Sequence, residues 1–124
     1  MQVPFVTTNV YISRLDSAVT APLHTDRFDS FILQTEGAKR WRIFGSSPAA
    51  PRWPVLDARM SDRGKAGDVL YLEQVGPMLL DECLASGDVL YLPRGFPHAT
   101  STFDTSKVST ACYSTSLTAP PLRP

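Results

Sequence analysis

The sequence lacks the features that membrane, secreted and nucleic-acid-binding proteins usually display. Its 124 residues contain 12 basic and 12 acidic side chains, so the formal net charge is zero. A neutral chain offers no electrostatic footprint for nucleic acid or an anionic membrane. No apolar run reaches the roughly 18 residues of a membrane-spanning helix, and the N-terminus has no basic segment followed by an apolar core. We therefore predict one domain with no direct nucleic-acid or membrane partner.

Cysteine is scarce as well, because Cys83 and Cys112 are the only two. Two isolated cysteines make neither a disulfide framework nor a zinc-binding C-x-x-C pair. Both stand in apolar surroundings, where a reduced, buried cysteine is common. We interpret them as reduced core residues of an intracellular protein.

Helical periodicity is absent over any stretch longer than two turns, whereas the 7 glycines and 11 prolines divide the chain into short apolar runs. Valine, isoleucine, leucine, tyrosine and phenylalanine dominate most of these runs, as strands prefer. The pattern predicts an all-β domain over residues 1–124, with a core at about 9–116 and a tail at 117–124. The expected strands are 9–13, 30–35, 39–44, 69–72, 78–83, 88–92 and 108–116.

Two glycine-containing features punctuate this pattern. Gly37 lies between two expected strands and predicts a tight hairpin, because glycine adopts positive φ without strain. The hexapeptide GDVLYL occurs at 67–72 and again at 87–92. Two copies do not make a solenoid, so we interpret each as a turn glycine followed by a buried strand. The segment 45–65 is expected to be a loop.

Histidine is the third scarce residue, with only His24 and His98 present. Residues i and i+2 of a strand share a face, so His24 and Asp26 can present an imidazole and a carboxylate to one point. An H-x-D pair alone is commonplace at exposed positions. His98 follows a Pro-Arg-Gly turn at a strand end, and with it the set becomes the two-histidine, one-carboxylate triad that holds Fe(II) with open positions.

Lys39 has an unusual place in the expected strand 39–44. Strand alternation puts it on the same face as Trp41 and Ile43, which belong in the core, whereas Arg40 takes the other face. A buried ammonium costs several kcal/mol unless it is paired, and a ligand carboxylate would pair it. The alternative is that Lys39 lies at the hairpin end and extends to solvent.

Further polar residues lie in strand-like segments, and each could hydrogen-bond a bound carboxylate or its water. The alternative for each is a satisfied core polar group. They are Tyr11, Ser30, Gln34, Thr110 and Ser114.

Three blocks together resemble the JmjC-type cupin oxygenases, most closely the ribosomal oxygenases, which hydroxylate histidine or arginine residues of ribosomal proteins. The blocks are NVYIS at 9–13, HTDRFDSFILQTEGAKRWRIF at 24–44 and GDVLYLPRGFPHATS at 87–101. The sequence VSTAC at 108–112 departs from the S-x-H-x-T pattern of the family.

The resemblance implies a double-stranded β-helix (cupin, or jelly-roll) fold and an Fe(II) site. The iron ligands would be His24, Asp26 and His98. Lys39 would bind the distal carboxylate of 2-oxoglutarate, Tyr11 would line the pocket, and Ser114 would lie near the same carboxylate.

The function implied is an Fe(II)- and 2-oxoglutarate-dependent dioxygenase that uses O2 to hydroxylate a protein side chain, with a ribosomal protein as the candidate substrate. Relatives dimerise and continue into a helical dimerisation segment and a winged-helix domain, neither of which is expected in this sequence. The expected location is the nucleus or nucleolus of a eukaryote, or the bacterial cytoplasm. The alternatives are a metal-binding cupin without oxygenase chemistry and an inactive, truncated JmjC fragment. A purely structural β-sandwich would leave His24, Asp26 and His98 scattered.

Overall fold

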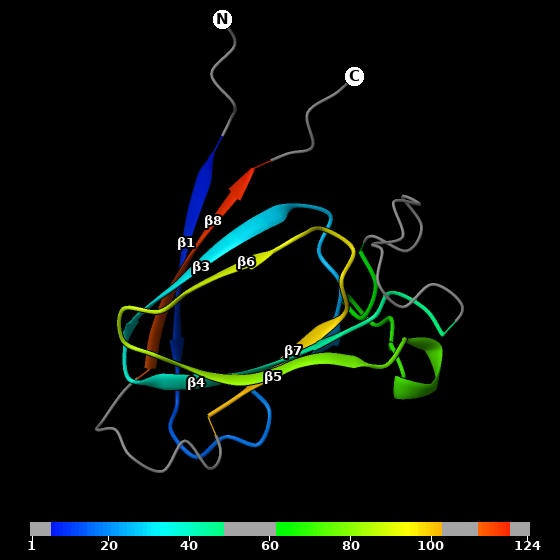
Figure 1. Ribbon diagram of the computed structural model, residues 1–124, viewed down its shortest axis with the longest axis horizontal. Coiled ribbons are helices and arrows are strands. Elements are labelled where there is room, and N and C mark those ends of the chain that lie inside the picture. The colour runs from blue at the N-terminus through cyan, green and yellow to red at the C-terminus, as the bar shows by residue number, and fades with distance from the viewer. Residues whose placement is uncertain (1–5, 49–61, 103–111, 120–124) are drawn as a thin grey trace, which may run out of the picture.

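The strands form two facing sheets (Figure 1). The computed structural model describes residues 6–48, 62–102 and 112–119, the last range by its backbone alone. Within these ranges the elements are β1 (Thr7–Ser13), β2 (Ala21–His24), β3 (Asp29–Glu36), β4 (Ala38–Phe44), the 3-10 helix η1 (Leu72–Gln74), β5 (Met78–Ala85), β6 (Val89–Leu92), β7 (His98–Ser101) and β8 (Cys112–Ala119).

All pairings between the strands are antiparallel. One sheet has the order β1-β8-β3-β6 and the other the order β2-β7-β4-β5. Neighbouring strands of each sheet are distant in sequence, as in a jelly roll. The all-β double-stranded β-helix fold is therefore confirmed. Among the described residues, no helix is long and apolar enough to cross a lipid bilayer.

Two short strands, β2 and β7, were not predicted from the sequence, and one predicted strand is wrong. β2 and β7 have four residues each and mix polar with apolar side chains, so neither shows a strand period. The predicted strand at 69–72 is instead extended coil that enters η1, because the side chain of Gln74 accepts a hydrogen bond from the backbone N–H of Tyr71 at 2.9 Å. A local helical turn thus replaces sheet pairing at this point.

The last strand also differs from its expected bounds. β8 runs to Ala119, three residues past the predicted end at 116, because its final residues pair with both β1 and β3. The pairs Thr7–Thr118 and Asp29–Ala119 show this. Residues 117–119 therefore belong to the sheet, and residues 108–111 lie outside the described ranges.

Gly37 makes the predicted tight turn, with φ of 72°, but the strands that it joins do not pair with each other. β3 pairs with β6 and β8, whereas β4 pairs with β5 and β7. The turn is therefore an arch from one sheet to the other, and the hairpin prediction is wrong. The buried faces of β3 and β4 consequently face each other across the interior.

The interior holds an apolar cluster and, beside it, buried polar side chains. The cluster consists of Ile32, Trp41, Ile43 and Leu92. On the same inward face of β3 as Ile32, Ser30 and Gln34 are also buried, whereas Phe31 and Leu33 on its outward face are half-exposed. An interior with polar groups is what a site for a polar ligand requires.

Cys83 contradicts its interpretation as a core residue. It lies opposite Arg40 in the β4–β5 ladder, and its side chain is exposed, with the thiol reduced. β5 is an edge strand that turns this residue outward while its neighbour Leu84 packs on the core. The side chain of Cys112 lies outside the described ones.

Candidate active site

The antiparallel pairing of β2 and β7 brings the two histidines together. His24 ends β2 and His98 begins β7, and the two are direct partners in the ladder. Their ring centroids are 4.2 Å apart. Asp26 lies in the turn beyond β2, so the expectation of His24 and Asp26 on one strand is wrong. The turn nevertheless directs the carboxylate toward both rings.

The three side chains converge on one point. One ligand atom from each of His24, Asp26 and His98 lies within 4.8 Å of the others. Asp26 Oδ2 is 3.5 Å from His98 Nε2 and 3.9 Å from His24 Nε2. Atoms that each lie about 2 Å from one metal ion are at most about 4 Å apart, so the two separations from Asp26 Oδ2 suit a shared ion.

Backbone carbonyls orient both imidazoles. His24 Nδ1 is 2.7 Å from the oxygen of Pro22, and His98 Nδ1 is 3.0 Å from the oxygen of Phe96. A carbonyl oxygen only accepts, so each Nδ1 carries the proton and donates it. Each Nε2 then keeps its lone pair free on the side of Asp26, which is the arrangement found in histidines that bind metals.

The pKa shifts in this cluster leave His98 and Asp26 ready to donate electron pairs to a metal at neutral pH. Burial, and then the charge of His24, lower the pKa of His98 to about 4. Burial alone would raise the pKa of Asp26, but His98, Lys65 and His24 together hold it below its usual range. At neutral pH the site therefore offers a neutral imidazole at His98 and a carboxylate at Asp26, as metal binding requires. Two histidines and one carboxylate suit Fe(II) with open positions.

A cavity of about 480 Å³ extends from this cluster between the sheets, within the roughly 300–1,000 Å³ of small-molecule sites. Lys39 and Tyr11 line it together with the three converging residues. Lys39 is only 5% exposed, so strand parity placed it correctly and the solvent-reaching alternative is wrong. Tyr11 is 51% exposed, so the cavity wall reaches solvent at this residue.

Ser114 is placed by its backbone only. It pairs with Tyr11 of β1 on one side and with Gln34 of β3 on the other. Its backbone therefore lies in the sheet that carries Tyr11, and its side chain is outside the described ones.

Trp41 lines the cavity and stacks against His98. The two rings are stacked, with centroids 5.8 Å apart and an interplanar angle of 22°. Trp41 is 8% exposed, in agreement with its interpretation as a packing residue. The stacked indole limits the rotation of the His98 ring.

Sequence reasoning missed the segment 62–68, which docks on the turn that carries Asp26. The backbone N–H of Thr25 donates to the oxygen of Arg63 at 3.0 Å, and the backbone N–H of Arg63 donates to Thr25 Oγ1 at 2.8 Å. Lys65 donates to both Asp26 and Asp62. A lone lysine in a polar loop has no periodicity, so only its neighbours in space distinguish it.

Gly64 gives a test of this docking. It has φ of +77°, and an added Cβ would lie 2.3 Å from the oxygen of Leu23 and 2.9 Å from His24 Cα. Gly64→Ala should lower the free energy of unfolding by about 3 kcal/mol, from backbone strain and the clash. Gly67→Ala is the matched control, since φ is +91° but nothing lies within 4 Å, and it should cost about 1 kcal/mol. Equal losses in chemical denaturation would contradict close docking.

The family model of the JmjC domain matches residues 1–123. The chain belongs to the JmjC domain family. The resemblance inferred from the three sequence blocks is thereby confirmed.

Curated relatives of this JmjC chain are much longer proteins. One from Brugia malayi, described as a bifunctional lysine-specific demethylase and histidyl-hydroxylase NO66, is 38% identical over 95 residues, which are 76% of this chain and 12% of that protein. The Drosophila melanogaster protein of the same description is 34% identical over 90 residues, which are 73% of this chain and 12% of that protein. The chain thus spans only a small part of the length of these relatives.

Solved structures share the fold. The Escherichia coli protein YcfD matches with a TM-score of 0.61 and 25% identity, over 94% of this chain and 26% of that one. A YcfD structure described as a ribosomal oxygenase in complex with cobalt and 2-oxoglutarate matches with a TM-score of 0.53 and 24% identity, over 83% of this chain and 20% of that one. The second likeness concerns the JmjC fold alone.

Proposed function

We propose that this JmjC domain is the catalytic core of an Fe(II)- and 2-oxoglutarate-dependent dioxygenase that hydroxylates a protein side chain. The observation that carries the proposal is the convergence of His24, Asp26 and His98 at a cavity that a buried Lys39 also lines. A metal-binding cupin that handles no dicarboxylate has no need of an inward lysine at that position.

The proposed reaction converts 2-oxoglutarate, O2 and a substrate C–H group into succinate, CO2 and a substrate C–OH group. When bound, the iron supplies the redox chemistry that couples decarboxylation to hydroxylation. His24, Asp26 and His98 would hold it on one face and leave the other positions open. The protein's own task is to bind, to orient and to exclude water.

Lys39 would orient the co-substrate. An ammonium group in a buried cavity wall can form a charge-assisted hydrogen bond with the carboxylate of 2-oxoglutarate farthest from the metal. Such bonds are stronger in surroundings that exclude water than at a surface. The apolar side chains of Ile32 and Leu92, which also line the cavity, provide those surroundings.

A ribosomal protein is the substrate we propose. The support comes from relatives, since the NO66 proteins are described as histidyl-hydroxylases and YcfD as a ribosomal oxygenase. Such a substrate would place the enzyme in the nucleus or nucleolus of a eukaryote, or in the bacterial cytoplasm. The half-exposed Tyr11 also lines the cavity, so an incoming side chain would contact it there.

The test is succinate formation from 2-oxoglutarate by the purified chain with Fe(II) and ribosomal-protein peptides. We expect succinate, and a peptide that gains one oxygen atom by mass spectrometry, with both products lost when the metal is chelated. Metal binding without succinate would instead support the cupin that lacks oxygenase chemistry. Succinate without peptide hydroxylation would count against the ribosomal substrate alone.

A further inference from the structure

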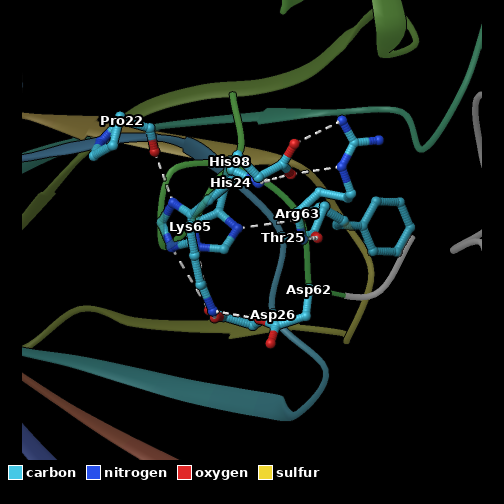
Figure 2. A network of polar contacts seen from close by, with 11 residues as sticks. Pro22, His24, Thr25, Asp26, Asp62, Arg63, Lys65 and His98 are labelled. Atoms are coloured by element: carbon cyan, nitrogen blue, oxygen red, sulfur yellow. Dashed lines mark hydrogen bonds and ion pairs between the residues drawn. The ribbon is translucent and has the colours of Figure 1, made fainter. Parts of the chain in front are cut away.

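The two oxygens of the Asp26 carboxylate have different partners. Oδ2 faces the imidazoles, at 3.5 Å from His98 Nε2 and 3.9 Å from His24 Nε2. Oδ1 accepts a hydrogen bond from the ammonium of Lys65. Figure 2 shows the Lys65 side chain reaching this carboxylate from the segment 62–68. Lys65 therefore contacts Oδ1, whereas the imidazoles lie nearest Oδ2.

Lys65 is itself anchored. Its ammonium also donates to Asp62 Oδ1 at 2.9 Å, so a second carboxylate, besides Asp26, offsets its positive charge. The side chain is 39% exposed and that of Asp26 30%. The Asp62–Lys65 pair brings no net charge to the site, but it brings a hydrogen-bond donor of fixed position.

The backbone that carries Lys65 is braced against the ligand turn. Arg63 forms two hydrogen bonds with the carboxylate of Asp68, at 2.6 and 3.2 Å, and the N–H of Gly64 donates to the same carboxylate at 2.8 Å. Thr25, which separates the two ligand candidates His24 and Asp26, exchanges two hydrogen bonds with Arg63. The segment and the ligand turn thus form one hydrogen-bonded unit.

From this geometry we propose that Lys65 is a positioning residue that holds Oδ1 of Asp26, so that the carboxylate presents only Oδ2 to the metal. The inference rests on the metal site of the proposed function. A carboxylate free to rotate would have to be ordered when the metal binds, at a cost in metal affinity. A group that hydrogen-bonds a ligating carboxylate fixes its orientation and strengthens metal binding.

The positive charge of Lys65 also repels a metal cation, and this repulsion would weaken metal binding. The carboxylate of Asp62 offsets that repulsion, because it forms an ion pair with the same ammonium. Without Asp62, repulsion would weigh more against the gain from orientation. The pairing of Lys65 with two carboxylates therefore favours a positioning role over competition with the metal.

The test is a titration of the metal-free protein with Co(II), followed by the visible absorption of the bound ion. Lys65→Met keeps the aliphatic stem and removes the ammonium. We expect it to weaken Co(II) binding about 10- to 100-fold, the usual effect of removing a group that orients a ligand, and to change the Co(II) spectrum. Lys65→Arg should restore most of the affinity. Arg40→Met, which removes the exposed Arg40–Asp81 ion pair on the outer face of β4, is the matched control and should leave affinity and spectrum unchanged.

Asp62→Asn provides a second variant that alters neither Lys65 nor a candidate ligand. It should also weaken Co(II) binding, and it decides the matter if Lys65→Met does not fold. Unchanged or tighter Co(II) binding in Lys65→Met, with the wild type binding normally, would overturn the positioning role and leave the proposed function intact. A wild-type protein that binds no Co(II) would overturn both.

Discussion

Replacing His98 by alanine is expected to abolish both metal binding and succinate formation. His98 supplies one of three donor groups, and two donors cannot hold an ion against water in an open site. The loss of metal affinity should exceed the roughly 10- to 100-fold effect expected for groups that only orient a ligand. Calorimetric titration with Co(II) and a succinate assay with Fe(II) measure the two effects.

The control for His98→Ala must remove a buried side chain from the same strand without removing a donor. Ser101→Ala meets this need, because Ser101 lies on β7, is 5% exposed and does not line the cavity. It should retain metal binding and turnover. Normal Co(II) affinity in His98→Ala would refute the ligand set, whereas losses of similar size in both variants would indicate damage to the strand.

The second large effect is expected for Lys39→Met, which removes the ammonium and keeps most of the stem. A hydrogen bond to a charged group contributes about 1.5–3 kcal/mol, so the affinity for 2-oxoglutarate should fall about 10- to 100-fold. Affinity for Co(II) should change little, since Lys39 is not one of the converging ligand candidates. The 2-oxoglutarate dependence of succinate formation, and binding to the Co(II)-loaded protein, give the two readouts.

Arg40→Met is the matched control for Lys39→Met. Arg40 is the next residue of β4 but lies on the exposed face, where it pairs with Asp81 at 2.6 Å. Loss of its charge should leave the 2-oxoglutarate dependence unchanged. If Lys39→Met instead weakens metal binding and leaves the 2-oxoglutarate dependence at the wild-type value, Lys39 has a structural role.

Strand alternation predicts which side chains face inward and short motifs predict the candidate ligands, and local sequence predicts no more of this site than that. Alternation along 39–44 placed Lys39 with Trp41 inside the barrel, and both are buried. The register that makes His24 the ladder partner of His98 could not be read from either segment. That register depends on β7 pairing with β4 as well as with β2, which is a property of the assembled sheet.

The repeated hexapeptide shows why some strands are not predictable. GDVLYL begins with a glycine of positive φ in both copies, 91° at Gly67 and 96° at Gly87. The second copy becomes β6 because β3 pairs with it, whereas the first enters η1. Identical residues take two conformations, so the difference must come from what surrounds them. Lys65 was missed for a related reason, since ion-pair partners in a loop are chosen by tertiary structure.

The arch at Gly37 has a consequence for how such a chain tolerates sequence change. β4 enters the opposite sheet directly after this one-residue turn, so the number of residues in the turn decides which of its side chains face inward. One inserted residue would exchange the faces of β4, bringing Arg40 toward the cavity and sending Lys39 and Trp41 outward. A change of length there would remove the interior charge and the support of His98 in one step.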